Sequence, residues 1–291
     1  TYTIDLAICT HCDEDHFGGF IYLLENMKNN PNTSVDIKKI LINDPGLHIT
    51  QDDVKYYQNI DNVRKEARSV YNANGKNLLE LIWELSQKRG LSYSEAFSDK
   101  HNSEFNGLID ILGPSIDFYK NQALLFRNDL KPYDYALADD NEDAYEIPET
   151  KKIYSKKLDE VGNDPSHHNK SSIIFLFKPD DEHYFLFTGD ADAESFENFK
   201  YQCDIEKIKN IYWMKLPHHG SAHNMSNDMI NYIHPKIAYV STEKYGHYLD
   251  KIVVGALKKV GTSIYSTNNT VNVWHHNNTP QRNDYSTAKK L

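Results

Sequence analysis

The sequence predicts an α/β layered fold, and two features of it carry that prediction. Short apolar runs of strand length recur along the chain, and apolar patterns with helical spacing separate several of them. Two of the runs, residues 172–177 and 183–187, flank the polar segment Lys-Pro-Asp-Asp-Glu, which is typical of a β-hairpin. Strands that alternate with helices favour helix-covered sheets, so we expect an α/β protein.

The first segment is predicted to fold as strand, loop and helix. Residues 3–9 (TIDLAIC) form a short apolar run that indicates a buried strand. A polar string at 10–16 and a Gly-Gly pair at 18–19 follow, and apolar residues then repeat at helical spacing from 20 to 27. Residues 39–43 (KILIN) predict a second strand, which Asp-Pro-Gly ends.

We expect residues 1–291 to form one domain, in which 47–165 is a helical elaboration. Three leucine and isoleucine residues of this stretch share one helical face, and Gly90 is a plausible C-cap. Residues 108–112 predict a strand, which Gly-Pro-Ser ends before another amphipathic helix.

The C-terminal part continues the alternation. Further strands are predicted at 211–216, 237–240 and 263–265. Ser226 can cap a helix, and apolar residues between 249 and 260 form another helical face that ends at glycine.

Net charge, the length of apolar runs and the number of cysteines limit which binding partners and cellular compartments are expected. The formal net charge is −10, so a broad basic face for long duplex DNA is not expected, whereas a short strand or a small phosphorylated ligand is compatible. No apolar run is long enough to span a bilayer, so we expect no membrane partner. The cysteines Cys9, Cys12 and Cys203 are too few and too irregular for a disulfide framework, which indicates a reducing cytoplasm.

The main chemical feature is the string His-Cys-Asp-Glu-Asp-His at residues 11–16. In an extended loop alternate side chains point the same way, so His11, Asp13 and Asp15 can converge, with His16 turning in from the helix start. Imidazole and carboxylate ligands together suit Zn, Mn or Fe. The alternative is a polar surface loop with accidental histidines, which the flanking strand and the glycine pair make less attractive.

Residues 10–19 (THCDEDHFGG) resemble the signature of the metallo-β-lactamase superfamily, in the variant with Asp for the second His that is typical of the metal-binding domain of ComEC. Three later segments are similar to that family in order and spacing, namely FTGD at 187–190, KLPHHGS at 215–221 and KYGH at 244–247. The resemblance implies an αββα sandwich and two divalent metal ions, Zn or Mn.

The resemblance also implies a set of ligands. His11 and Asp13 would hold the first metal, Asp15 and His16 would hold the second, and Asp190 would bridge both.

His218 or His219 would complete a coordination sphere, and its neighbour would orient it or contact substrate. His247 would lie at the mouth of the site, as a ligand or as a partner for the scissile group. The expected catalytic residues are therefore Asp15, Asp190 and His247.

Other residues have simpler interpretations. Cys12 is expected to be a buried thiol rather than a ligand, and Ser221 to shape or cap a turn rather than act as a nucleophile. Glu14 should face solvent. The histidine pairs at 167–168 and 275–276 are interpreted as solvated surface and set aside.

The sequence departs from the family at two places. Members begin with a strand hairpin before the histidine signature, and none precedes Thr1, so we expect the sandwich to lack its N-terminal strands. A missing N-terminal segment or a partner chain would then complete the sheet. The helical stretch before residue 172 is also larger than a minimal member of the family needs. The substrate specificity of the family therefore cannot be assigned to this chain.

The leading functional hypothesis is a phosphodiesterase or nuclease, in which a hydroxide bridging two ions attacks phosphorus. Its substrate would be short or single-stranded nucleic acid or a small phosphodiester. One alternative is hydrolysis of a lactone, a β-lactam or another small ester or amide, which Asp13 disfavours because carboxylates select harder metals. Another is a non-catalytic module of a larger complex, stapled by metal, which the acid-rich and open ligand set disfavours.

Overall fold

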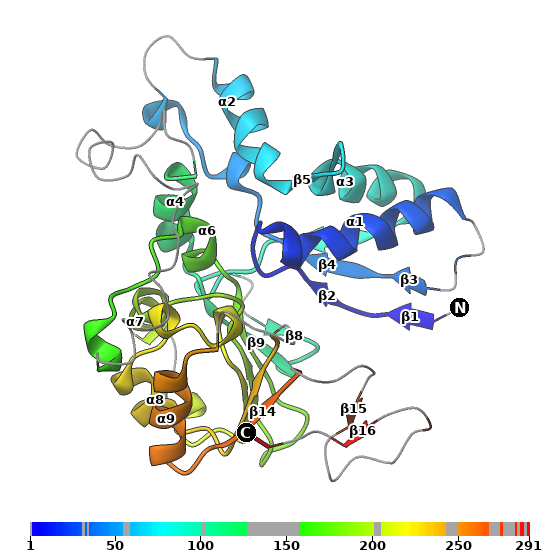
Figure 1. Ribbon diagram of the computed structural model, residues 1–291. Coiled ribbons are helices and arrows are strands. Elements are labelled where there is room, and N and C mark those ends of the chain that lie inside the picture. The colour runs from blue at the N-terminus through cyan, green and yellow to red at the C-terminus, as the bar shows by residue number, and fades with distance from the viewer. Residues whose placement is uncertain are drawn as a thin grey trace. The chain divides into compact units, whose positions relative to one another are not determined.

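The computed structural model describes residues 2–30, 33, 35–54, 59–100, 103–126, 157–200, 205–242 and 249–267, with scattered positions after 273. The chain is mixed α/β, as predicted, and eight α-helices lie within the described residues (Figure 1). It divides into two compact units, which are described separately. Unit 1 comprises 1–102, 113–142 and 166–173, and unit 2 comprises 103–112, 143–165 and 174–291.

Unit 1 contains a parallel three-stranded sheet in the order β2 (Ala7–Ile8), β4 (Lys39–Leu41) and β7 (Ser92–Ser94). A second parallel pair joins β1 (Tyr2–Ile4) to β3 (Val35–Ile37). The single strand predicted over 3–9 is thus two strands with different partners.

The break in these strands falls between an acid and a base that pair across it. Asp5 follows β1, Lys38 lies between β3 and β4, and their side chains form an exposed ion pair of 2.7 Å. The backbone N–H of Lys38 also donates to the carbonyl of Ile4 (2.9 Å).

The helices of unit 1 bury one face each. They are α1 (Glu14–Asn29), α2 (Ile60–Ala67), α3 (Leu78–Arg89), α4 (Ile116–Leu124) and α6 (His167–Lys170). The predicted apolar face of α3 is buried, and Gly90 takes the left-handed conformation (φ 71°) at its C-cap, as expected. The core of this unit joins that face to Phe17, Leu24 and Met27 of α1.

Within 47–165 the described residues form strands as well as helices. The described part of this stretch holds α2, α3 and α4, together with the short strands β5 (Asn72–Ala73), β6 (Lys76–Asn77), β8 (Ser103–Glu104) and β9 (Ile109–Gly113), and β7. Ser115 caps α4 by accepting a hydrogen bond from the Phe118 N–H (3.2 Å), so the predicted break before that helix is correct.

Unit 2 is built on a seven-stranded mixed sheet in the order β14-β13-β12-β11-β10-β9-β8. The strands after β9 are β10 (Ile174–Phe177), β11 (Phe185–Phe187), β12 (Trp213–Lys215), β13 (Ile237–Val240) and β14 (Ser263–Ser266). The predicted hairpin is confirmed, because β10 and β11 pair antiparallel. From β11 to β14 the strands are parallel.

The two faces of this sheet differ in chemistry, because successive side chains of a strand point to opposite faces. Aliphatic residues such as Leu186 and Met214 join the core that includes buried residues of α7 (Ala193–Lys200), α8 (Asn227–Ile233) and α9 (Lys251–Lys259). The opposite face is aromatic across five strands. Its residues are Phe175, Phe177, Phe185, Phe187, Trp213, Tyr239 and Tyr265, whose rings contact one another from strand to strand.

The C-terminal helix predictions also agree with the structure. Ser226 caps α8, since its Oγ accepts from the Met229 N–H (3.1 Å), and α9 ends two residues before Gly261. A last parallel pair joins β15 (Trp274–His275) and β16 (Ser286–Thr287).

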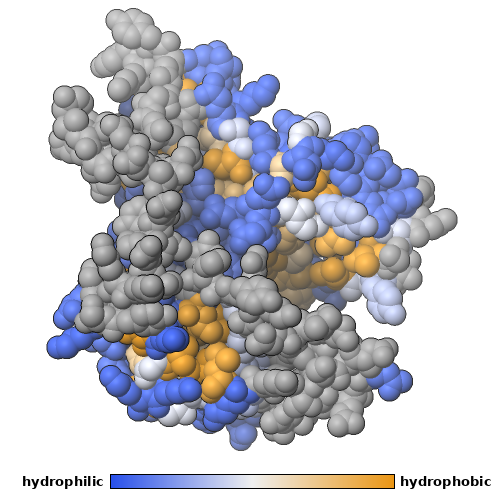
Figure 2. Space-filling model, viewed as in Figure 1, coloured by the Kyte–Doolittle hydropathy of each residue, from blue (hydrophilic) through white to orange (hydrophobic). Residues whose placement is uncertain are grey.

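Hydrophilic side chains predominate among the described residues on the face seen in Figure 2, with smaller hydrophobic patches between them. Among the described residues, no helix has the length and apolarity that crossing a bilayer requires.

The core of unit 2 should be sensitive to loss of volume. Leu186 is completely buried, so Leu186→Ala should lower the free energy of unfolding by about 2–5 kcal/mol through lost burial and a residual cavity. Leu108→Ala, at a residue of the same unit that is 36% exposed, is the matched control and should cost much less. Urea unfolding of both variants measures the difference, and equal losses would contradict this placement of the core.

Candidate metal centre

The ligand-rich loop of unit 1 joins β2 to α1 and is shorter than the sequence suggests. Asp13 is the N-cap residue, so Asp15 and His16 already lie in the first turn of α1. Asp15 therefore does not continue the extended alternation that was expected to align it with His11 and Asp13. Its acidic side chain is favourable at a helix N-terminus, and it is 62% exposed with a carboxylate oxygen 3.5 Å from His16 Nε2.

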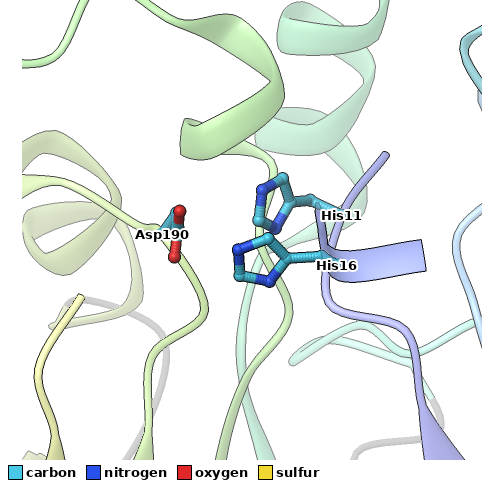
Figure 3. A group of neighbouring side chains, drawn as sticks. All are labelled: His11, His16 and Asp190. Carbon is cyan, nitrogen blue, oxygen red and sulfur yellow. The ribbon is translucent and has the colours of Figure 1, made fainter. Parts of the chain in front are cut away.

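The rings of His11, on this loop, and His16, in the first turn of α1, lie side by side with centroids 4.2 Å apart (Figure 3). The Thr10 hydroxyl is 3.1 Å from His11 Nδ1 and 3.4 Å from His16 Nδ1. Ser172 Oγ also lies 3.2 Å from His11 Nδ1. These hydroxyls fix the rings through Nδ1, so Nε2 is the nitrogen that a metal ion would use.

Asp13 has a different neighbour at each carboxylate oxygen. Oδ2 lies 3.6 Å from His11 Nε2, and Oδ1 lies 3.0 Å from His168 Nδ1. Burial favours the neutral acid, but the contacts with the His11 and His168 rings outweigh it and hold the pKa of Asp13 well below its usual range. Asp13 is therefore ionised and ready to act as a ligand.

His168 is a correction to the sequence analysis, which set the pair His167-His168 aside as solvated surface. His168 lies on α6, contacts Asp13 and meets the edge of the Phe126 ring (4.5 Å between centroids). His167 Nδ1 pairs with Gln122 Oε1 at 2.8 Å.

The reason for this error is a long-range contact. The N–H of Ile173 donates to the carbonyl of Thr10 (2.8 Å), which holds residues 166–173 against the ligand loop. A pairing of two loops about 160 residues apart in sequence leaves no local pattern; the one available signal was that the pair lies just before a predicted strand.

The burial expected of Cys12 and the solvent exposure expected of Glu14 are both observed. Cys12 is buried (4% exposed) in the core of the unit, and burial raises the pKa of its thiol well above the ordinary value. Glu14 is exposed to solvent.

In unit 2, Asp190, labelled in Figure 3, follows β11 and is 3% exposed. Its Oδ1 accepts a hydrogen bond from the backbone N–H of His218 (3.2 Å) and lies 3.4 Å from Lys215 Nζ. The lysine also donates to the carbonyl of Gly189 (3.0 Å). The carboxylate is thus fixed in the loop after the strand, where the FTGD resemblance placed it.

His218 is oriented by residues that the sequence analysis did not identify. Its Nδ1 lies 3.0 Å from Asp164 Oδ2 and 3.0 Å from Asn224 Oδ1. Burial lowers the pKa of His218, but the hydrogen bond to Asp164 and the charges of Asp190 and Asp164 outweigh it, so the pKa is raised. Asn224 also donates to both Asp164 Oδ2 and the Asp190 carbonyl, 2.8 Å each.

The His218-His219-Gly220 turn after β12 has three consecutive residues at positive φ, of 38°, 52° and 82°. Left-handed backbone is costly for a histidine, and such strain is characteristic of functional sites. His219 Nδ1 lies 2.6 Å from the Ser241 carbonyl, which orients this ring as well. The Nδ1 atoms of His218 and His219 are therefore both held by neighbouring oxygens.

Ser221 has the capping role that was expected, since its Oγ accepts a hydrogen bond from the His223 N–H (3.2 Å). The expected site residue His247 lies outside the described residues. So do Cys203 and His276, and the side chain of His275 is not described either.

Each unit thus has a set of imidazole and carboxylate donors whose rings are held at Nδ1. In unit 1 the set is His11, Asp13, His16 and His168, with Asp15 at its edge; in unit 2 it is Asp190, His218 and His219. Nitrogen and carboxylate oxygen donors of this kind fit Zn or Mn.

No family model, curated protein or solved structure matches the chain. The chemistry of the site is therefore argued from its residues.

Gly220 should be needed for the histidine turn. A Cβ atom at Gly220 would lie 2.7 Å from Leu249 Cδ1, whereas Gly261 has the same φ of 82° with open space around it. Gly261→Ala should cost about 1–2 kcal/mol of stability from left-handed backbone alone. Gly220→Ala should cost about 1 kcal/mol more, because Leu249 must shift. Thermal unfolding of both variants measures this, and equal shifts would count against a tight packing of the turn.

Asp164 should act through His218. Asp164→Ala removes the carboxylate that orients the ring, and loss of such a partner typically weakens metal binding by about 10–100-fold. Asp159→Ala, an exposed acid that pairs with Asn227 in the same unit, is the control and should leave metal affinity unchanged. Competition titration against a metal indicator measures both; equal affinity in the two variants would exclude His218 as a ligand oriented by Asp164.

Proposed function

We propose that the chain is a binuclear metallohydrolase that cleaves phosphodiesters, acting as a nuclease on short or single-stranded nucleic acid or on a small phosphodiester. The observation that carries this proposal is the orientation of the histidines. His11, His16 and His218 each have Nδ1 next to a hydroxyl or carboxylate oxygen, while carboxylates lie nearby. That is the arrangement of oriented metal ligands rather than of solvated surface histidines.

The ligand assignment follows the resemblance together with the local geometry. His11 and Asp13 would hold one divalent ion, Asp15 and His16 the other, and Asp190 would bridge them. His218 or His219 would complete the set, and His168 is added as the neighbour of Asp13. When bound, two Zn or Mn ions would supply charge neutralisation for the phosphate and a nucleophile derived from water.

The remaining residues have supporting roles. Thr10 and Ser172 orient the rings of unit 1, and Asp164 and Asn224 orient His218. Asp190 is held in place by hydrogen bonds from the loop that carries His218. By resemblance, either His247 or whichever of the paired histidines is not a ligand would stabilise the leaving oxygen.

We also propose the finer fold, a metallo-β-lactamase αββα sandwich. In such a sandwich two sheets stack face to face, and helices cover the outer face of each. The sheet of unit 2 has a helix-covered aliphatic face and an opposite aromatic face, which includes Tyr239 and Tyr265 at 8% exposure each. An aromatic face of this size is of the kind that a second sheet buries, and it supports the proposal.

Phosphodiesters are the favoured substrate class because the donor set contains several carboxylates. Carboxylate ligands favour harder ions such as Mn, which bind phosphate oxygen well. Two of these carboxylates, on Asp13 and Asp190, are half-buried and buried, respectively, next to hydrogen-bond partners. Short substrates are preferred over long duplex DNA because the chain has a net charge of −10.

The test is cleavage of a 5′-labelled single-stranded oligonucleotide by metal-stripped protein reconstituted with Mn²⁺ or Zn²⁺. Asp190→Asn and Asp15→Asn should each lower the rate by at least about 100-fold, because each removes a carboxylate ligand. Glu14→Gln is the matched control, since it neutralises the adjacent exposed acid on the same helix turn, and it should retain the wild-type rate.

The same preparations are then offered bis(p-nitrophenyl) phosphate, nitrocefin and a simple lactone. Hydrolysis of the phosphodiester alone supports the proposal. Lactone or nitrocefin turnover without phosphodiester cleavage would replace it with small-molecule ester or amide hydrolysis. Metal uptake without any hydrolysis, or normal rates in Asp190→Asn, would refute the assignment.

A further inference from the structure

The Oδ1 side of Asp13 has its own cluster of ligand-type atoms within unit 1. Oδ2 is on the side of His11, whereas Oδ1 lies 3.0 Å from His168 Nδ1. The third member is the thiol of Cys12, the residue before Asp13. The ligand atoms of Cys12, Asp13 and His168 all lie within 4.8 Å of one another. The hydrolytic assignment uses the His11 side of this carboxylate and leaves the thiol without a role.

These three donors match the preferences of one class of ion. Thiolate sulfur, imidazole nitrogen and carboxylate oxygen bind Zn²⁺ at about 2.3, 2.0–2.1 and 2.0–2.2 Å. Tetrahedral bonds of these lengths separate neighbouring donors by about 3.3–3.7 Å. Asp13 Oδ1 and His168 Nδ1 are now joined by a hydrogen bond of 3.0 Å, and the Cys12 sulfur lies within 4.8 Å of a ligand atom of each of these two residues, so side-chain adjustment would bring the three donors to ligand spacing.

The surroundings also suit an ion. Cys12 is 4% exposed, so its thiolate would be shielded from water and from oxidants. The His168 and Asp13 side chains are 34% and 35% exposed, which leaves a route for the ion from solvent. The His168 ring also makes an edge-type contact with Phe126 (4.5 Å between centroids). One thiolate and one carboxylate together balance the double charge of the ion.

We propose that Cys12, Asp13 and His168 form a thiolate-containing site for a thiophilic divalent cation, with Zn²⁺ as the expected class. Binding would replace the Cys12 thiol proton, which passes to solvent, and would use His168 as a neutral imidazole with its ring proton on Nε2. Asp13 then has Oδ1 on this ion and Oδ2 on the side of His11, so its carboxylate connects the two sites. The proposal concerns metal binding alone and stands whether or not the chain is a hydrolase.

The test uses Co²⁺, because a thiolate ligand gives an intense near-ultraviolet charge-transfer band that nitrogen and oxygen ligands do not. The protein carries Cys9→Ala and Cys203→Ser, so that Cys12 is its one remaining thiol. Titration of metal-stripped protein with Co²⁺ should develop the band to saturation, and Zn²⁺ should abolish it by displacement. Adding Cys12→Ser should remove the band while leaving Co²⁺ binding by nitrogen and oxygen donors detectable.

His168→Ala keeps the proposal testable if replacement of the buried Cys12 impairs folding, because His168 is partly exposed. It should weaken the Co²⁺ affinity read from the thiolate band by at least about tenfold, the lower end of what even indirect ligand changes cost. His167→Ala, which removes the neighbouring imidazole that pairs with Gln122, is the control and should leave that affinity unchanged. A folded Cys12-only protein without a thiolate band at saturating Co²⁺, or with a band that His168→Ala does not weaken, would overturn the proposal.

Discussion

Carboxylates withdrawn from water need hydrogen-bond donors or positive charge nearby, and much of the structure around the candidate site meets this need. Asp190 is fixed by the His218 backbone and approached by Lys215, and Asp164 pairs with His218 and Asn224. A histidine that satisfies a carboxylate through Nδ1 presents Nε2 in a defined direction. The same hydrogen bonds therefore offset the cost of burying the carboxylates and orient the histidine rings. A substitution that removes one of them should affect both the stability of the loop and its metal binding.

The positions of the site loops follow from strand geometry. The loop that carries His11 leaves the C-terminal end of β2, and those that carry Asp190 and His218 leave the C-terminal ends of β11 and β12. Within each unit these are parallel strands, and ligands of open α/β sheets bind beyond the carboxyl ends of such strands. The backbone arrangement accordingly places ligand-type side chains at the end of the sheet where their loops are free to vary.

Much of the local structure could be predicted because it depends on residues close in sequence. The hairpin of β10 and β11, the face of α3 with its Gly90 cap, and the Ser226 cap each depend on periodicity or on a single capping residue. Boundaries were harder to predict. The first strand divides at Asp5, which pairs with Lys38 beside the break, and no apolar pattern records this division.

The site was predictable only in part, for a related reason. The string at 11–16 identified the loop, but the turn at which α1 begins decides where Asp15 points. Residues that orient the ligands come from distant segments: Ser172 and His168 from 166–173, and Asp164 from just before it. Their types are common on protein surfaces, so spacing alone does not distinguish them. The resemblance of four ordered motifs implied a metal site. The residues that orient its ligands depend on contacts between distant segments, which the sequence alone does not reveal.

The histidine turn after β12 has a consequence for how this segment can change through evolution. Three successive left-handed residues restrict the side chains that positions 218–220 can accept, since β-branched residues are disfavoured at positive φ and any Cβ at Gly220 meets Leu249. The backbone conformation alone therefore limits which amino acids can replace those at positions 218–220, independently of any requirement for metal binding. A descendant that lost its ligands could still retain a glycine here, so the glycine is a marker of ancestry in the fold rather than of activity.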